Sequence, residues 1–427
     1  MKLTRRAFIG GAATAALIAG TRATGTVFGA NERVRVACVG LNGRGGSHID
    51  AFSSSGNSEV VALCDVDSKV LQECASALET KTGKKPVLAA DVRELLARDD
   101  VDAISIATPN HLHTIISIWA CQAGKDVYVE KPLSHDFWEG KQLVAAAKKF
   151  NRVVQHGTQS RSSATWQKAI NLIQNGAIGE VHTARGCVYK NGNRGSIGIK
   201  DNCDPPEWLN WNLWQGPAQE QPFNPNYHPY NWHWFWRYGN GEIGNQGVHQ
   251  MDIAVWGLNK GLPVKVYTGG GRYTYKDQAE TPNTSATVFT YADGTMMTFE
   301  VRNRFTNDES GVRVGNIFYG SEGYYVQNKG FFDKDDKPVT PEEETPKGPS
   351  AFENFINAVK SRKPEDIHGN AEQGHLSAAH CHLANISYRL GRSLVFDPAT
   401  EKFVNDDEAN SMLRAVNRPG FEVPEIA

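Results

Sequence analysis

A glycine-rich turn after a short apolar run limits the possible folds of this chain more than any other feature. The run Val34–Leu41 reads VRVACVGL and is apolar on both faces, which is typical of a buried parallel strand. It leads into the turn Gly40-Leu-Asn-Gly-Arg-Gly-Gly46, and a helix is predicted directly afterwards. A strand, a glycine turn and a helix in this order predict the first unit of a parallel α/β sheet.

Strands and helices continue to alternate up to about residue 157. Further helices are predicted from Asp91, over 115–123, and after Ser134, which is the expected N-cap. This alternation predicts a parallel sheet covered by helices on both faces. The further predicted strands are 60–66, 86–89, 101–107, 126–130 and 153–157.

The pattern changes after residue 158. A helix (166–174) and a strand (182–189) are followed by a long irregular stretch, 191–247, and long ordered loops are usually functional. From 263 onward hairpin signals predict antiparallel strands, and helices over 350–361 and 371–390 are expected to close this second domain. The expected division is a leader (1–30), a dinucleotide-binding domain of Rossmann type (31–157) and a substrate domain (158–427).

The glycine turn has the spacing of a dinucleotide-binding loop. Gly40 and Gly45 match the first and last glycines of G-x-G-x-x-G, with Asn42 in the middle glycine position. Such a turn lets the backbone approach a pyrophosphate at a helix N-terminus. Asp65 ends the next strand, where a carboxylate binds ribose hydroxyls and repels a 2′-phosphate, so NAD is predicted rather than NADP. The candidates from this unit are Gly40, Asn42, Gly43, Arg44, Gly45 and Asp65.

Two further motifs stand at the carboxyl ends of later strands. They are Thr108-Pro-Asn110-x-x-His113 and Glu130-Lys131-Pro132. Ligands of open parallel sheets bind outside those strand ends. Thr108, Asn110, His113, Glu130 and Lys131 are therefore added to the predicted cofactor site.

These motifs in this order, followed by Gly247-Val-His249, resemble the glucose–fructose oxidoreductase/inositol dehydrogenase (Gfo/Idh/MocA) family over about residues 33–330. The resemblance implies a Rossmann domain and a second domain with a large, mostly antiparallel sheet that also covers the active site. It implies hydride transfer between a nicotinamide cofactor and a hydroxyl of a sugar, polyol or related compound.

The resemblance also implies two catalytic roles, with one departure. Lys131 matches the lysine that polarises the reacting oxygen, and His249 matches the histidine that takes the hydroxyl proton. The family commonly has Asp-x-Gly-x-His, whereas this chain has Asn245, which can only form hydrogen bonds. Asp252 lies on the same helical face as His249 and is either an orienting partner for its ring or an ordinary helix acid. The catalytic candidates are Lys131, His249, Asn245 and Asp252.

Tryptophans are concentrated in the irregular stretch, where six of the ten fall between residues 208 and 236. Aromatic rings stack on the apolar faces of sugars, which predicts a carbohydrate cleft. Part of the cluster is expected in the core instead, because alternate positions 232, 234 and 236 fit a strand. The substrate candidates are Tyr230, Trp232, His233 and Trp236.

No metal site or disulfide framework is predicted. The seven cysteines form no Cys-x-x-Cys pair and are read as small buried apolar residues. His375, His380 and His382 are read as helix surface, because positions 380 and 382 point apart on a helix.

The chain begins like a secretory leader. Arg5-Arg6 precede an apolar segment rich in Ala and Gly, Ala7–Gly20, which is too short and too weakly apolar to span a membrane. The order Thr-Arg-Arg-x-Phe-Ile resembles a twin-arginine signal, which exports folded proteins, here to the periplasm. An amphipathic or disordered start is the alternative. No stable membrane insertion is expected once the leader is removed.

The net charge and the predicted export limit the classes of function that this protein can have. With 45 Lys and Arg against 47 Asp and Glu, the net charge of −2 gives no basic surface for nucleic acid, so the expected partner is a small carbohydrate. Homo-oligomerisation stays open. The leading hypothesis is an oxidoreductase with a tightly bound cofactor that is regenerated in each cycle. The alternatives are an NAD-dependent glycoside hydrolase or lyase working by oxidation, elimination and reduction, and a non-catalytic carbohydrate-binding relative.

Overall fold

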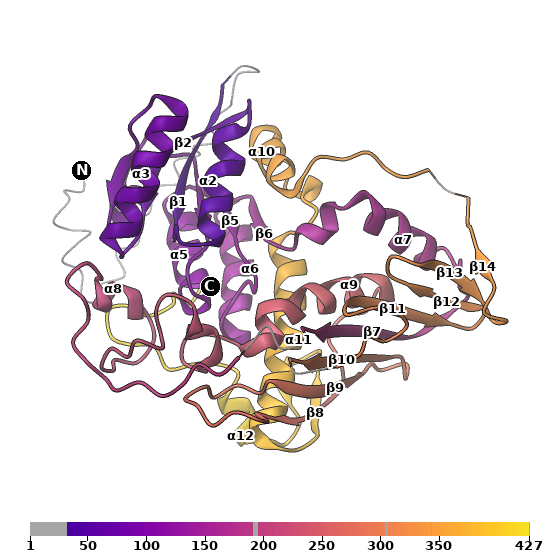
Figure 1. The fold of residues 1–427 in the computed structure, drawn as a ribbon. Coiled ribbons are helices and arrows are strands. Elements are labelled where there is room, and N and C mark those ends of the chain that lie inside the picture. Colours follow the sequence, from indigo (N-terminus) through magenta and orange to yellow (C-terminus); the bar gives the residue numbers. More distant parts are fainter. Residues whose placement is uncertain (1–31, 191–194, 304–305, 343, 427) are drawn as a thin grey trace.

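The computed structural model describes residues 32–190, 195–303, 306–342 and 344–426, which form two sheets joined by helices (Figure 1). The predicted leader lies outside the described residues. Within the described residues, no helix is long and apolar enough to cross a membrane.

The first sheet has six parallel strands in the order β3-β2-β1-β4-β5-β6. The order reverses between β1 and β4, which is the switch point where open α/β sheets bind their ligands. The doubly wound parallel sheet is confirmed. The strands are β1 (Val34–Val39), β2 (Ser58–Cys64), β3 (Val87–Ala89), β4 (Ala103–Ile106), β5 (Asp126–Val129) and β6 (Val154–His156).

Aspartate side chains cap three of the helices around this sheet, α3, α4 and α6, whereas α2 and α5 begin without a side-chain cap. Asp67 accepts hydrogen bonds from two backbone N–H groups of α3, and Asp91 caps α4. The predicted cap Ser134 is wrong: its hydroxyl lies 3.1 Å from His382 Nε2, and Asp136 caps α6 instead through Glu139 N at 2.7 Å. The helices are α2 (Arg44–Ser54), α3 (Ser68–Thr82), α4 (Val92–Leu96), α5 (Asn110–Gln122) and α6 (Phe137–Lys149).

The second sheet has ten strands in the order β14-β13-β12-β11-β7-β10-β9-β8-β15-β16. Only the described pair β7 and β10 is parallel, so the mostly antiparallel sheet is confirmed. The strands are β7 (Val181–Tyr189), β8 (Lys265–Gly271), β9 (Thr284–Thr290), β10 (Met296–Arg302), β11 (Val314–Gly320), β12 (Gly323–Val326), β13 (Gly330–Asp333), β14 (Pro338–Val339), β15 (Leu394–Asp397) and β16 (Lys402–Phe403).

Helices α7 (Ala164–Gln174), α9 (Val248–Leu258) and α11 (Ala371–Leu390) share one apolar core with the second sheet. Gly257 of α9 allows a close approach, because a Cβ there would lie 2.3 Å from the Phe318 ring. Figure 1 shows α11 between the two sheets, and it also contacts α6 and β6 of the first half. Helix α11 therefore joins the two halves.

The chain returns to the first sheet near its end. The predicted helix over 350–361 is present as α10 (Ala351–Ser361), but its Phe355 and Val359 pack with Phe52 and Tyr128 of the first half. Helix α10 thus follows the second sheet in the chain but packs against the first half. Val423 also joins the core of the first half.

The irregular stretch contains short helices and no strand in its described part. They are α8 (Trp211–Gln215), the 3₁₀ turn η2 (Asn231–Trp234) and the π-helical turn η3 (Ile243–Gly247). The expected strand over 232–236 is wrong, because η2 turns the chain and buries Trp232 and Trp234 together. The remaining short elements are η1 (Gln159–Ser162), η4 (Pro364–Asp366) and α12 (Asp407–Ser411).

Candidate active site

A cleft of about 560 Å³ opens at the carboxyl edge of the first sheet. Its floor comes from the glycine turn, the end of β2 and the strand-end motifs that follow β4 and β5. Its other wall comes from the irregular stretch, η3 and the first turn of α9. The structure thus brings together all the predicted cofactor residues except Gly45, and all the predicted catalytic ones except Asp252.

The glycine turn is shaped by two close approaches. Gly40 has φ +76°, and a Cβ there would lie 2.7 Å from Thr108 N. A Cβ on Gly45 would lie 1.9 Å from the Gly40 carbonyl oxygen, so no other residue fits. Asn42 is exposed and is not among the residues with positive φ, which explains why a side chain is tolerated at the middle position.

Asp65 holds the turn against the end of β2. Its carboxylate accepts hydrogen bonds from Leu41 N at 2.8 Å and from Asp67 N at 2.9 Å. Burial raises the pKa of Asp65 to about 6. The carboxylate lines the cleft at the edge nearest β2, as the sequence predicts.

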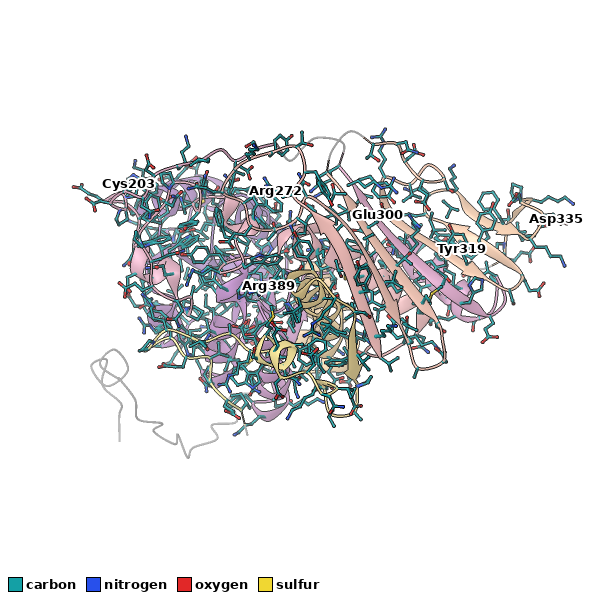
Figure 2. All side chains as sticks on the ribbon, turned by 90° about the horizontal axis from the view of Figure 1, so that it is seen from below. Cys203, Arg272, Glu300, Tyr319, Asp335 and Arg389 are labelled. Carbon is teal, nitrogen blue, oxygen red and sulfur yellow. The ribbon has the colours of Figure 1, made fainter. Side chains whose placement is uncertain are left out.

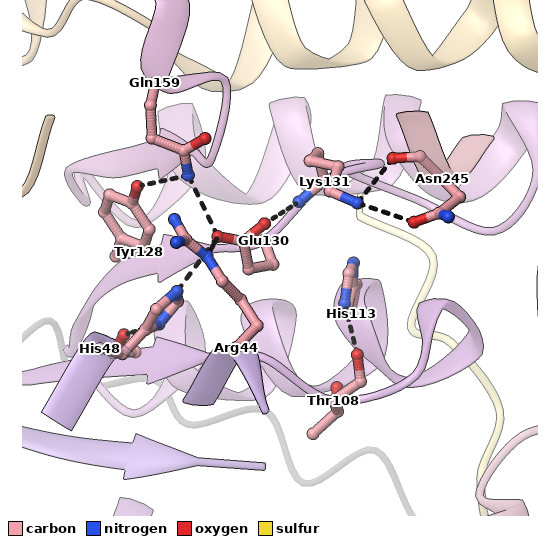
Figure 3. A network of polar contacts seen from close by, with 10 residues as sticks. Arg44, His48, Thr108, His113, Tyr128, Glu130, Lys131, Gln159 and Asn245 are labelled. Carbon is pink, nitrogen blue, oxygen red and sulfur yellow. Dashed lines mark hydrogen bonds and ion pairs between the residues drawn. The ribbon is translucent and has the colours of Figure 1, made fainter. Parts of the chain in front are cut away.

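Glu130 lies at the centre of a buried network of hydrogen bonds at the end of β5 (Figure 3). Its Oε1 accepts hydrogen bonds from Arg44 Nε at 2.7 Å and Gln159 Nε2 at 3.1 Å, and lies 3.1 Å from His48 Nε2. Burial alone would raise the pKa of Glu130, but the His48 hydrogen bond and the nearby cations hold it well below its usual value. Glu130 therefore stays ionised and fixes the strand end that carries Lys131.

Lys131 points from this strand end toward η3. Its Nζ donates to the backbone oxygen of Asn245 at 2.6 Å and lies 3.3 Å from Asn245 Oδ1 (Figure 3). Burial lowers the pKa of Lys131. Since both acceptors are neutral, Lys131 has no carboxylate of η3 as a counter-ion. The Asn245 Nδ2 group is buried and has no partner among the described protein atoms.

His249 lies in the first turn of α9, four residues after Asn245, and lines the same cleft. Burial, together with the charge of Lys131, lowers the pKa of His249 to about 3. The imidazole is consequently neutral near pH 7 and able to accept a proton.

Asp252 does not orient the His249 ring, which corrects one of the two alternatives for it. Its carboxylate is buried and lies 2.9 Å from Arg161 Nε through both oxygens. Ser377 Oγ of α11 donates to Oδ1 at 2.6 Å. Asp252 therefore connects α9 to η1 and α11.

His113 joins the two strand-end motifs. Its Nδ1 lies 2.7 Å from the Pro132 oxygen and its Nε2 lies 2.8 Å from the Thr108 oxygen. Both ring nitrogens are thus engaged with backbone carbonyls. Thr108 Oγ1 and Asn110 Oδ1 are buried beside it, without partners among the described protein atoms.

The aromatic candidates divide between two places. Tyr230, Trp232 and His233 line the cleft, and the ring centroids of the last two are 3.6 Å apart. Trp236 is not in the cleft: its ring packs beneath the guanidinium of Arg389, at 5.4 Å, in a different cavity. Its predicted place beside the other candidates is therefore wrong, because η2 redirects the chain.

Several residues that line the cleft are not among the predicted candidates, and Gln159, Trp214 and His228 are examples. Gln159 follows β6, so the rule about strand ends could have found it. Trp214 belongs to the tryptophan cluster from which a carbohydrate cleft is predicted, whereas His228 carries no comparable signal.

His380 and His382 of α11 are buried and His375 is half-buried, which corrects their assignment to a helix surface. His380 Nε2 lies 3.0 Å from Tyr291 OH, and His382 contacts Ser134. The cysteines are all free; five are buried, Cys74 is half-buried and Cys203 is exposed. No cluster of the described residues is arranged to hold a metal ion.

The cleft fits a dinucleotide. The close approaches at Gly40 and Gly45 leave backbone open to a pyrophosphate, and Asp65 lies where a ribose would bind. Thr108 and Asn110 supply unpartnered polar atoms in the wall near Lys131 and His249. A glycine turn, an acid after β2 and a lysine–histidine pair at one cleft define an oxidoreductase of the Rossmann class.

Comparison with protein families agrees with this class. The description "Oxidoreductase family, NAD-binding Rossmann fold" matches residues 34–158, and "Oxidoreductase family, C-terminal alpha/beta domain" matches residues 167–423. The chain belongs to the Gfo/Idh/MocA oxidoreductase family. Its cofactor is accordingly a nicotinamide dinucleotide.

Among curated proteins, a glycosyl hydrolase family 109 protein of Shewanella pealeana is 29% identical over 167 residues. The match covers 38% of this chain and 37% of that protein, so only about a third of the relative's length is matched.

Two solved structures show the same fold. The WlbA dehydrogenase from Bordetella pertussis, in complex with NADH and UDP-GlcNAcA, has a TM-score of 0.65 at 22% identity, covering 86% of this chain and 98% of that one. The aldose-aldose oxidoreductase from Caulobacter crescentus, complexed with glycerol, has a TM-score of 0.61 at 18% identity, covering 86% of this chain and 100% of that one.

Proposed function

We propose that the protein is an NAD-dependent oxidoreductase that acts on a hydroxyl group of a sugar, polyol or glycoside. One observation carries the proposal: the Lys131 ammonium and the neutral His249 imidazole line the same cleft as the glycine turn. A cation and a base are the two groups that oxidation of an alcohol requires from the protein.

Each residue then has a chemical task. A bound nicotinamide supplies the acceptor for the hydrogen on the carbinol carbon. His249 accepts the hydroxyl proton, and Lys131 stabilises the negative charge that develops on the oxygen. Asn245 holds the ammonium through its backbone oxygen at 2.6 Å, which fixes the direction of the cation. Glu130 and Arg44 keep the strand end in place beneath it.

Asp65 favours NAD. A carboxylate at the ribose edge of the cleft would accept hydrogen bonds from both ribose hydroxyls and repel the 2′-phosphate of NADP. Tyr230, Trp232 and His233 form the aromatic wall to which we assign the carbohydrate.

A second candidate is a redox-neutral glycosidase or lyase that retains its cofactor. The curated relatives named glycosyl hydrolase family 109 support it. In this scheme the same Lys131 and His249 serve an oxidation, an elimination and a reduction within one cycle, and the glycosidic bond breaks without net redox change. Tight binding of the cofactor is common to both candidates.

The test begins with freshly purified protein that is denatured to release its nicotinamide. Bound NAD(H) supports a retained cofactor, and a preparation without nicotinamide contradicts it. Release of p-nitrophenol from p-nitrophenyl glycosides without added cofactor identifies the second candidate. A parent protein that binds sugar without measurable turnover, and Lys131→Ala and His249→Ala variants that bind it equally well, would favour a non-catalytic carbohydrate-binding protein and contradict both.

We also propose export by the twin-arginine pathway to the periplasm. Paired Arg5-Arg6 before an apolar segment support it, and export in the folded state lets the cofactor be loaded beforehand. Replacing both arginines with lysine should keep the protein in the cytoplasmic fraction. Unchanged periplasmic recovery of that variant would contradict the proposal.

A further inference from the structure

A second cavity, of about 530 Å³, lies behind the wall of the cofactor cleft. His111 of α5 faces it, whereas the flanking Asn110 and Leu112 face the cleft, so the first turn of α5 separates the two spaces. Its volume is within the range of small-ligand sites. None of the residues assigned to the proposed chemistry lines it.

The inner wall of this cavity holds unpartnered acceptors. Asn240 and Asn385 are each only 6% exposed, and their Nδ2 groups donate to backbone oxygens of His135 and Asn240, at 2.9 and 3.0 Å. Both Oδ1 atoms are left without partners among the described protein atoms, as is His135 Nε2. A buried acceptor without a partner is unfavourable, so this wall favours a ligand with hydroxyl donors.

The rim of the cavity is cationic. Arg237, Arg389 and Arg414 all line it and are exposed. Arg389 forms no direct ion pair with a carboxylate of the described residues, although the charge of Glu280 acts on it, and its guanidinium lies over the Trp236 ring at 5.4 Å. Arg389 belongs to the last turn of α11, and Figure 2 shows it near the middle of the molecule as seen from below. The one carboxylate of the rim, Glu280, already accepts a hydrogen bond from Trp236 N at 2.7 Å.

The two buried acids of the cavity, Asp136 and Glu139, accept hydrogen bonds from backbone N–H groups. Asp136 accepts from Glu139 N and from Ala415 N, each at 2.7 Å. Glu139 accepts from His135 N at 2.9 Å. Both carboxylates therefore satisfy internal backbone N–H groups. The groups left for a ligand are amide oxygens, an imidazole nitrogen and guanidinium groups.

We propose that this cavity is a second binding site, which takes an acidic sugar. The hydroxyl groups of the ligand donate to Asn240 and Asn385, and its anionic group binds Arg389 at the rim beside Trp236. The proposal does not depend on the proposed oxidoreductase function, because the site lies outside the cleft.

The test is calorimetric titration of the full-length protein with D-glucuronate, D-glucose 6-phosphate and D-glucose. We expect one equivalent of an acidic sugar to bind, with glucose at least about tenfold weaker, and the tighter of the two acids identifies carboxylate or phosphate as the preferred anion. Equal binding of glucose and both acids overturns the acidic class. No binding of either acid overturns the site.

Three variants test whether the acidic sugar binds in this cavity or in the cofactor cleft. Arg389→Met should weaken binding of the acidic sugar about tenfold or more. Arg313→Met, which replaces an exposed arginine just before β11, should leave that binding unchanged. Lys131→Met removes the cation of the cleft and should also leave it unchanged. Loss of binding in Lys131→Met with retention in Arg389→Met would put the ligand in the cleft and overturn the proposal. The thermal midpoint of each variant confirms that it is folded.

Discussion

Asn245 gives Lys131 two neutral oxygens where an aspartate would give it a negative charge. The ammonium therefore has no carboxylate on η3, and its nearby negative charges are those of Glu130 and Glu242. Burial lowers the pKa of His249 to about 3, and the charge of Lys131 acts in the same direction. A neutral amide at position 245 adds no negative charge that would oppose this shift.

The variant Asn245→Asp tests this directly. A carboxylate beside Lys131 and His249 favours their charged forms and raises the pKa of His249, by about 1–3 units. His249 acts as a base only when neutral, so activity is present above its pKa and is lost as pH falls through it. The acid limb of the kcat/KM profile should therefore move toward neutral pH.

A matched change at an exposed helix end, Asn175→Asp, should leave that profile in place. An acid limb that does not move in Asn245→Asp would contradict the proposed charge coupling.

At the scale of elements, the Arg161–Asp252 ion pair connects η1, α9 and α11 behind the cleft. Both side chains are buried, so removing one charge leaves the other uncompensated. Asp252→Asn is expected to lower the free energy of unfolding by about 3–5 kcal/mol, measured by urea denaturation. The control variant Asp50→Asn removes the exposed ion pair with Lys81 and should change the free energy of unfolding by less than about 1 kcal/mol. A similar small effect at Asp252 would show that the pair does not hold α9.

The strand-to-helix turn before α2 leads to a second prediction. Gly45→Ala places a Cβ 1.9 Å from the Gly40 oxygen and must displace the turn, so NAD binding should weaken by at least about tenfold. Gly56→Ala is the control, since a Cβ there meets nothing within 4 Å. Fluorescence titration with NADH measures both. Equal affinities would mean that the turn does not contact the cofactor.

At the scale of the whole molecule, the two sheets are parts of one packed unit. Phe355 of α10 is fully buried with the first sheet, although it follows the second sheet in the chain. Phe355→Ala should lower the free energy of unfolding by about 3–5 kcal/mol. Both halves should then unfold at the same lowered temperature, in one calorimetric transition. A separate, unshifted transition for the second half would show that the halves unfold independently.

The parts of this molecule that the sequence predicts are those set by local pattern. The parallel strands follow from apolar runs, and the cleft follows from glycines and polar residues at strand ends, including Lys131. The partners of Asp252, the burial of His380 and the place of Trp236 depend on segments far away in the chain. No local spacing encodes those contacts, because they arise only when α9, α11 and η2 pack together.

The return of α10 to the first sheet has a consequence for synthesis on the ribosome. The strands of the nucleotide-binding half are made first, yet Phe355 and Val423 of its core are translated long after them. A nascent chain that has released only the first sheet still exposes the apolar surface that α10 will cover. The cofactor-binding half therefore reaches its final form only after the residues up to Val423 have left the exit tunnel.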